Sequence, residues 1–400
     1  MRLRSKFAVK CAKATSSLIK KLNRGSGVTL PGYVARLIDP NILKELSGQV
    51  RKKTIVTMGT NGKTTTTSMI SQILLCAAAD PTLSVGGILD AIGGNIRVGH
   101  SDIFVTEACE YTNSFLHFHP RYSIILDIEA EHLDFFKDIN DIRHSFHLFA
   151  KNTISDGAII MNGQIERPEE ITEGLSQEVI TYGLDPSFTY YAKDITYNEK
   201  ACGRFSVYKN GEKLGKVALS VPGEHNVYNS LAAIAVTEKM GISLEDIIHG
   251  LSIFGGAKRR FELKGKVNGI TVIDDYAHHP TEIEATLHAA KNYPHGRLIC
   301  VFQPHTYSRT KAFLKDFAKA LSLADIVVLA DIYAAREKNT IGISSTAILD
   351  ELKALGTESY YFPSFGEIED FLLENCVNND LLITMGAGDI YTVGEHLLGQ

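Results

Sequence analysis

A glycine-containing turn between an apolar run and a helical pattern constrains this chain more than any other feature. Residues 57–66 read TMGTNGKTTT and follow Ile55 and Val56. Apolar residues then recur with helical spacing, at Met69, Ile70, Ile73 and Leu74. A turn that joins a strand to a helix in this way presents backbone N–H groups and a helix N-terminus to a polyphosphate. The pattern therefore predicts a parallel α/β sheet with an ATP site at the end of this strand.

Two residues of the turn carry the predicted chemistry. Lys63 is placed to reach the β- and γ-phosphates, and Thr64 can offer its hydroxyl to Mg²⁺. The generic phosphate-loop pattern begins with a glycine where this chain has Thr57. A glycine turn without any ligand is therefore the alternative interpretation.

Composition excludes several classes of protein. A length of 400 residues predicts two domains, and 44% hydrophobic with 22% charged residues is typical of soluble α/β proteins. The net charge of -5 gives no global attraction to nucleic acid. The six cysteines are scattered without a C-x-x-C pair, which argues against a zinc ribbon or a disulfide framework. Without a membrane-spanning run or a secretory signal, a cytoplasmic location is expected.

The apolar runs predict two sheets. From residue 51 to 256, short runs alternate with helical stretches, which predicts a central P-loop ATPase domain with a mostly parallel sheet. An alternating segment at 204–208, followed by Asn210-Gly211, predicts an antiparallel hairpin within it. From residue 257 to 400, buried-strand runs separated by helices predict a C-terminal doubly wound, Rossmann-like domain. The boundary is placed at the glycine pair 255–256.

Residues 1–50 are predicted to form a basic helical appendage. Residues 1–24 contain eight lysines and arginines and no acidic residue, with apolar residues near helical spacing. A second short helix is expected at 41–46. The basic helix would either contact an anionic membrane surface or pack on the neighbouring domain.

Polar side chains follow two predicted strands beside the glycine turn. Glu107 and Glu110 follow the strand at 103–106, and His132 follows the strand at 124–128. Because ligands of open α/β sheets bind at the carboxyl edge, these groups can hold a divalent ion beside the γ-phosphate. A surface ion pair or a satisfied histidine is the alternative for each.

Other polar segments predict further parts of a site. Residues 222–229 open an alanine-rich helix, where Asn226 either contacts a nucleotide or caps the helix. The basic cluster at 258–262 can close onto an anion or remain a solvated turn. Three strand-end segments predict a substrate-binding rim on the second sheet, at 274–280, 303–309 and 386–389. A zinc site from the histidines of that rim, His278, His279 and His305, lacks a firm ligand spacing.

Taken together, these segments resemble the Mur ligase superfamily. Its central domain carries Gly-Thr-(Asn/His)-Gly-Lys-Thr-Thr, matched here by Gly59 to Thr65, and this form accounts for the missing first glycine. From about residue 83 to Gln400 the chain is similar to the UDP-N-acetylmuramate–L-alanine ligases in particular. The matching segments are 85–87, 106–110, 128–134, 223–229, 259–261, 274–282, 302–310 and 384–389.

The resemblance implies ATP-dependent amide formation in peptidoglycan synthesis. A muramyl carboxylate would attack the γ-phosphate of ATP, and the amine of L-alanine would displace phosphate from the acyl phosphate. By position, the implied catalytic residues are Lys63, Glu107, His132 and His278. The implied Mg²⁺ ligands are Thr64, Glu107 and His132, and the implied L-alanine contacts are His278 and Arg309. The implied ATP contacts are Gly59, Thr60, Asn61, Gly62, Lys63, Thr64, Thr65, His225, Asn226, Asn229, Arg260, Asp274 and Asp275.

Three features depart from this family pattern. The ligases carry an N-terminal Rossmann-like domain that binds the UDP part of the substrate, and the chain is expected to lack room for it before Gly59. Residues 1 to about 75 resemble instead the start of MurT, the Mur-ligase-like subunit of the lipid II amidating enzyme, whose four-cysteine zinc ribbon is missing here. Thr306 stands where many alanine ligases have arginine.

Two alternatives to the ligase follow from these departures. One is a MurT-like subunit that activates a lipid II carboxylate and takes ammonia from a glutaminase partner. The other is an ATP-binding regulator without catalysis. The preferred hypothesis is the ligase that joins L-alanine to a muramyl carboxylate.

Overall fold

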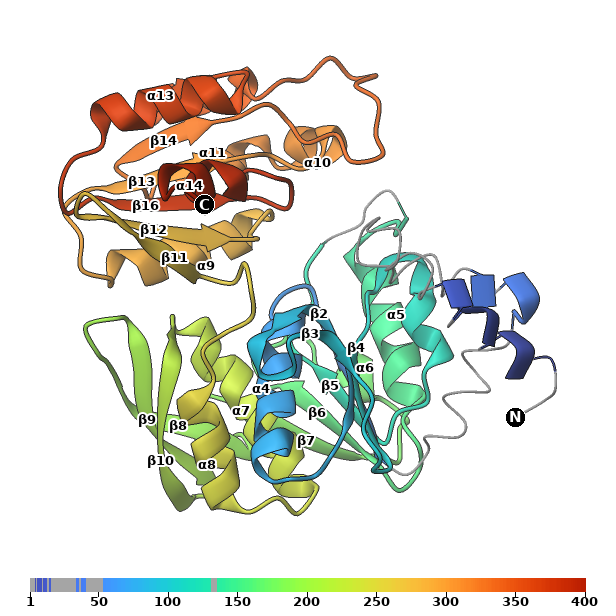
Figure 1. Cartoon of the computed structure of the whole chain (residues 1–400). Coiled ribbons are helices and arrows are strands. Elements are labelled where there is room, and N and C mark those ends of the chain that lie inside the picture. Colours follow the sequence, from blue (N-terminus) through green and yellow to red (C-terminus); the bar gives the residue numbers. More distant parts are fainter. Residues whose placement is uncertain are drawn as a thin grey trace.

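The computed structural model describes residues 53–130 and 135–400, together with short stretches between residues 4 and 15 and between 34 and 40. Two α/β units follow one another along the chain, each built on its own sheet (Figure 1). Residues 254–261 join the last helix of the first unit to the first strand of the second. This arrangement confirms the predicted α/β fold with two mainly parallel sheets.

The first sheet has ten strands in the order β10-β9-β8-β7-β6-β5-β1-β4-β2-β3. Strands β2, β4, β1, β5, β6, β7 and β8 pair in parallel, and β3, β9 and β10 are antiparallel to their neighbours. Because β4, β1 and β5 are adjacent, the segments that follow them meet at one edge. The strand bounds are β1 Lys53–Met58, β2 Thr82–Leu89, β3 Gly94–Arg97, β4 Ile103–Glu107, β5 Tyr122–Ile125, β6 Ala158–Asn162, β7 Glu178–Gly183, β8 Tyr190–Tyr197, β9 Cys202–Lys209 and β10 Glu212–Pro222.

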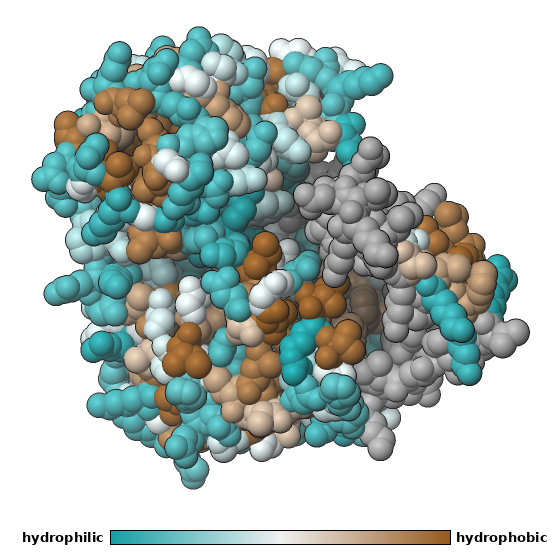
Figure 2. Space-filling model, in the orientation of Figure 1, coloured by the Kyte–Doolittle hydropathy of each residue, from teal (hydrophilic) through white to brown (hydrophobic). Residues whose placement is uncertain are grey.

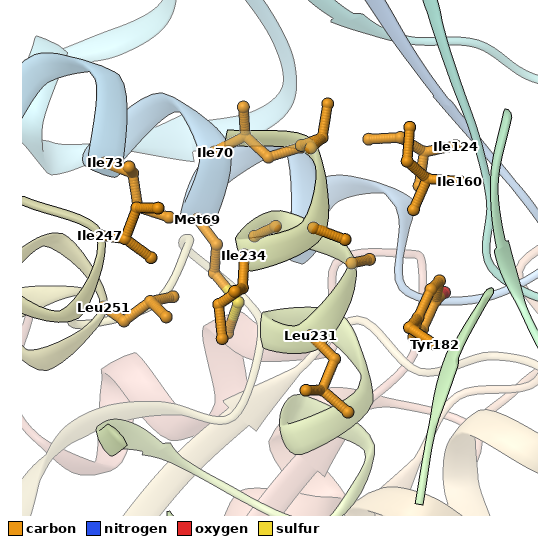
Figure 3. Packing of buried hydrophobic residues seen from close by; sticks show 14 of the residues in the cluster. Met69, Ile70, Ile73, Ile124, Ile160, Tyr182, Leu231, Ile234, Ile247 and Leu251 are labelled. Carbon is orange, nitrogen blue, oxygen red and sulfur yellow. The ribbon is translucent and has the colours of Figure 1, made fainter. Parts of the chain in front are cut away.

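Helices cover both faces of this sheet. Ile55 of β1 faces α4, α7 and α8, while its neighbour Val56 faces α5 and α6, as expected from the period of two along a strand. Figure 3 shows the first of these cores, where Met69 and Ile73 meet Ile234 and Ile247. The bounds are α4 Lys63–Cys76, η1 Asp90–Ile92, η2 Tyr111–His117, α5 Ile139–Lys151, α6 Glu169–Thr172, α7 His225–Lys239 and α8 Leu244–Ile253.

The second sheet has six strands in the order β11-β12-β16-β13-β14-β15, and only β11 is antiparallel to its neighbour. Adjacent strands β12, β16 and β13 bring the three predicted rim segments to one edge. The bounds are β11 Glu262–Val267, β12 Ile270–Asp275, β13 Leu298–Phe302, β14 Ile326–Leu329, β15 Glu358–Tyr361 and β16 Leu381–Met385.

One face of this sheet packs on α9, α11 and α12, and the other on α13 and α14. The doubly wound prediction for this part of the chain is therefore confirmed. The bounds are α9 Pro280–Lys291, α10 Tyr307–Ala312, α11 Leu314–Leu321, α12 Thr346–Ala354, α13 Phe365–Asn375 and α14 Tyr391–Leu397.

Several local predictions can be compared with the structure. The hairpin at Asn210-Gly211 is confirmed as the β9–β10 turn. The strand expected at 124–128 is wrong in its end, because β5 stops at Ile125 and the chain turns towards the glycine loop. Described residues between 4 and 15 are helical, and Ala8 is buried against Ala35. The helix expected at 41–46 lies outside the described residues.

An apolar cavity of about 220 Å³ lies between β11–β12 and the α13–α14 side of the second unit. Its outer wall includes Leu373 and Val377, and Figure 2 shows apolar side chains gathered at this end of the molecule. Among the described residues, none of the predicted site residues lines this cavity. No helix in the described ranges is both long and apolar enough to cross a membrane.

Candidate active site

The glycine loop joins β1 to α4 and holds Lys63 against itself. Gly62 has φ 77°, a left-handed conformation that favours glycine, and a Cβ there would lie 2.5 Å from Asn229 Oδ1. Lys63 Nζ donates to the carbonyl oxygens of Gly59 and, at 2.9 Å, Thr60, and lies 3.4 Å from Glu110 Oε2. The ammonium group is thus held at the mouth of the loop, where a phosphate would meet it.

An oxygen pair lies beside this lysine. Thr64 Oγ1 donates to Glu107 Oε2 at 2.8 Å, and the backbone N–H of Gly86 donates to Glu107 Oε1. The parallel pairing of β1 with β4 places Glu107 level with Thr57. His132, the third predicted ligand, lies outside the described residues. Within the described ranges, no group of three His, Cys, Asp or Glu side chains is arranged to hold a metal, so the zinc alternative gains no support.

A cleft with a volume of about 250 Å³ lies between the two units. Its walls come from the glycine loop, the end of β5, the start of α7, the joining segment and the start of α9. Gly59, Thr60 and Lys63 do not line the cleft but belong to the same loop as Asn61 and Gly62, which do, and Glu107 contacts the lining residue Thr64. The predicted residues that line it are Asn61, Gly62, Thr64, Thr65, His225, Asn226, Asn229, Arg260 and Asp275.

The start of α7 forms an amide chain that ends at helix α4. Thr66 Oγ1 donates to Asn229 Oδ1 at 3.2 Å, and Asn229 Nδ2 donates to Asn226 Oδ1 at 3.0 Å. Asn226 Nδ2 donates to the Pro222 carbonyl at 2.7 Å, so Asn226 does not cap the helix. Burial, followed by the charge of Arg260, lowers the pKa of His225 to about 4. This imidazole is therefore neutral at pH 7.

The structure separates the two aspartates at the end of β12. Asp275 lines the cleft and accepts from the N–H groups of Phe261 (2.9 Å) and Ala277 (2.7 Å). Burial raises the pKa of Asp275 to about 6, against the pull of Arg260. Asp274 points to the opposite side of the strand, where Arg259 holds it, and does not line the cleft. Its predicted nucleotide contact is therefore not supported by its position.

His278 and Arg309 lie in a second cluster, beside the cleft. His278 Nδ1 is 3.1 Å from the Tyr276 carbonyl oxygen and 3.2 Å from Glu282 Oε2, and its ring meets that of His305 edge to face at 5.6 Å. Arg309 donates to the His305 carbonyl at 3.2 Å. Burial lowers the pKa of His305 to about 4, with help from His278 and Arg309. The two predicted L-alanine contacts therefore meet around a neutral imidazole.

Asp127 is a site residue that the sequence prediction missed. Its carboxylate accepts from the Asn61 backbone N–H (2.9 Å) and from Asn61 Nδ2 (2.7 Å), and it lines the cleft. Burial raises the pKa of Asp127 to about 7, with Glu129 adding to the effect and Asn61 and Lys63 opposing it. The prediction missed Asp127 because it placed the end of the strand at residue 128, whereas β5 ends at Ile125. A strand that continues to residue 128 would put Asp127 inside the sheet and not at its polar edge.

Asp127→Asn should change how stability depends on pH. Because the folded-state pKa is raised, the wild type binds this proton more tightly when folded and loses the corresponding stability as pH rises from about 4 to about 7. The variant lacks this loss, so its free energy of unfolding relative to wild type should rise by about 1–3 kcal/mol between pH 4.5 and pH 8. Urea titrations of both proteins across this range measure the difference. Asp275 is present in both proteins, so its titration does not contribute to the difference between them. The same difference in unfolding free energy at pH 4.5 and at pH 8 would contradict the raised pKa of Asp127.

Comparisons with known proteins give the family. Residues 56–237 match the Mur ligase middle domain, and residues 259–388 match the Mur ligase glutamate ligase domain. The UDP-N-acetylmuramate–L-alanine ligase of Agathobacter rectalis is 65% identical over 357 residues, which are 88% of this chain and 78% of that protein. The ligase of the same description from Lachnospira eligens is 59% identical over 358 residues, with the same two coverages.

Solved structures agree with the sequence relatives. The UDP-N-acetylmuramate-alanine ligase MurC of Thermotoga maritima superposes with a TM-score of 0.76 at 30% identity, over 92% of this chain and 81% of that one. None of these matches concerns MurT, and the resemblance of residues 1–75 to it stays a prediction. Identity at this level, over most of both chains and both domains, shows that the chain belongs to the UDP-N-acetylmuramate–L-alanine ligase family of Mur ligases.

Proposed function

We propose that this chain joins L-alanine to the carboxylate of UDP-N-acetylmuramate, using ATP, in the cytoplasmic part of peptidoglycan synthesis. The observation that carries the proposal is the cleft, which brings the glycine loop of one unit to Arg260 and Asp275 of the other. We assign residues 51–256 and 257–400 to two domains that close on the nucleotide. Each of the two sheets has its own hydrophobic core, which supports this division.

The glycine loop and α4 would bind the triphosphate. Lys63 already lies at the loop mouth, so exchanging carbonyl oxygens for phosphate oxygens requires only a side-chain movement. The neutral His225 and the amides of Asn226 and Asn229 offer hydrogen bonds without a charge that must be desolvated. Arg260, 3.7 Å from Glu282, would add positive charge from the C-terminal domain.

The oxygen pair of Thr64 and Glu107 fits Mg²⁺, which prefers hard oxygen ligands beside phosphates. His132 is assigned to the same site by resemblance. A bound cation would neutralise charge that otherwise keeps the attacking carboxylate away from the γ-phosphate. Thr64 and Glu107 would orient this cation, and Lys63 would stabilise the negative charge on the γ-phosphate as it passes from ADP to the carboxylate.

His278 and Arg309 would place L-alanine for the second step. Arg309 offers a guanidinium suited to a carboxylate, and its contact with His305 fixes its direction. His278 is oriented by Tyr276 and Glu282, so its ring has a defined position at the start of α9. The amine of L-alanine would then displace phosphate from the acyl phosphate, which domain closure protects from water.

Phosphate release tests this function directly. With ATP, Mg²⁺ and UDP-N-acetylmuramate, release should depend on L-alanine, with one amide formed for each phosphate, and D-alanine serves as the matched control. Release that requires ammonia or a glutaminase would favour the amidating subunit. ATP binding without release under any of these conditions would favour the regulator.

A further inference from the structure

Glu129 connects the glycine loop to the other domain. It follows β5, and its backbone N–H donates to Thr60 Oγ1 at 3.1 Å. Its side chain crosses the cleft, where Oε2 accepts from Thr281 Oγ1 at 2.9 Å in the first turn of α9. The same oxygen lies 3.8 Å from His279 Nδ1. One residue therefore contacts both the phosphate loop and the helix that begins beside His278.

The start of α9 is held together from within its own domain. Glu282 Oε2 accepts from the backbone N–H groups of His278 (3.0 Å) and His279 (3.3 Å). Burial opposes the ionisation of Glu282, but His278 and Arg260 outweigh it and hold its pKa below the usual range. Residues 278–282 thus form one ordered segment. Internal contacts of this kind set the shape of the segment but not its position relative to the glycine loop.

The position of segment 278–282 relative to the glycine loop depends on contacts across the cleft. A second contact, from the Lys258 N–H to the Ile88 carbonyl at 3.0 Å, is made by the joining segment itself. A contact next to a hinge limits rotation of the domains less than one at the far side of the cleft. The Glu129–Thr281 hydrogen bond lies at the cleft itself, whose walls include Asn61 and Gly62 of the loop and Thr281 and Glu282 of α9.

We propose that Glu129 is a positioning residue that couples the phosphate loop to the amino-acid subsite. Through Thr281 it fixes the start of α9, and with it His278, relative to the γ-phosphate. The proposal rests on the proposed function for the identity of the amino acid. The contact itself rests only on the geometry of the cleft.

Kinetics of Glu129→Ala, Thr281→Val and the double variant test this coupling. A hydrogen bond to a charged acceptor corresponds to about a tenfold effect, so each single change should raise the KM for L-alanine about tenfold. The KM for ATP should stay within about threefold. Because both changes remove the same contact, the double variant should be no worse than either single one. Glu129→Gln keeps an acceptor for Thr281 and should restore most of the affinity.

Glu284→Ala is the matched control, since Glu284 lies exposed on the same helix beside His288. It should leave both KM values unchanged. Independent effects of the Glu129 and Thr281 changes, or an unchanged KM for L-alanine, would overturn the proposal.

Hydrogen exchange gives a readout that does not require turnover. With ADP and Mg²⁺ bound, the amides of residues 281–285 should gain protection in wild type and lose that gain in Glu129→Ala. Equal exchange in the two proteins would also overturn the proposal. If the wild type shows no L-alanine-dependent release, the proposed function fails, whereas the exchange experiment still decides whether Glu129 couples the domains.

Discussion

Lys63→Ala should lower ATP-dependent phosphate release by about 10²–10³-fold or more, because it removes a preorganised positive charge from the transferring phosphate. The loop itself should remain folded, since its shape depends on Gly62 and on the hydrogen bonds of Asn61 to Asp127 rather than on the lysine side chain. Lys63 Nζ contacts the carbonyl oxygens of Gly59 and Thr60 in the loop and the carboxylate of Glu110. The effect should therefore be on turnover, with a change of only a few degrees in the melting temperature.

Steady-state phosphate release and calorimetry separate these two effects. Lys151→Ala, on the exposed surface of α5, is the control and should match wild type in both measurements. Turnover by Lys63→Ala close to that of wild type would remove the lysine from the reaction.

Arg259→Ala should cost the most stability of the changes considered, about 3–5 kcal/mol, because it leaves a buried carboxylate without its cation. Arg259 Nε donates to Asp274 at 2.8 Å, and Asp274 is 1% exposed. Its other nitrogens donate to the carbonyl oxygens of Gly386 (2.7 Å) and Gly388 (2.9 Å). Burial raises the pKa of Asp274 and the charge of Arg259 opposes that rise, so the loss of Arg259 exposes the full cost of burying the carboxylate.

Urea denaturation measures this cost, and a second change identifies its source. If the unpaired charge is the cause, Asp274→Asn should recover a large part of the stability lost in Arg259→Ala. Lys239→Ala breaks an exposed ion pair with Glu178 and should cost less than about 1 kcal/mol. An equal loss of stability in Arg259→Ala and Lys239→Ala would show that the ion pair of Arg259 with Asp274 contributes no more than a surface contact.

The neighbouring arginines show where sequence reasoning stops. Residues 258–262 were recognisable as a basic cluster, and the resemblance pointed to Arg260 as the nucleotide contact. Arg260 does line the cleft, whereas Arg259 turns back and stacks on Tyr276 and Tyr391 at 5.0 and 4.5 Å. Adjacent side chains with the same charge thus take different roles, and only the path of the backbone between the domains separates them.

Local chemistry was enough for the elements and the edges of the sheets. The apolar runs predicted most of the strands, Asn210-Gly211 predicted the hairpin, and the turn at 57–66 predicted the strand, loop and helix that the structure shows. Polar segments after strands also predicted which edge carries the site, because parallel pairing brings successive strand ends together. The predicted strands did not include β2, β3, β8, β11 or β15. Of these, β3, β11 and β15 lie at sheet edges and carry mixed, partly exposed residues.

The sequence by itself determined the phosphate loop and the residue types at both strand-end clusters, because these depend on contacts within a few residues. Only the tertiary structure decided three features of the site. Asp275 rather than Asp274 faces the cleft, Asp127 accepts a hydrogen bond from the Asn61 N–H, and Glu129 accepts one from Thr281. The first depends on the face of a strand, and the other two on contacts between residues 66 and 152 positions apart. The Asn61–Asp127 contact forms when β1 and β5 pair in one sheet, and the Glu129–Thr281 contact forms when the two units pack together. The pattern of any single segment contains neither contact.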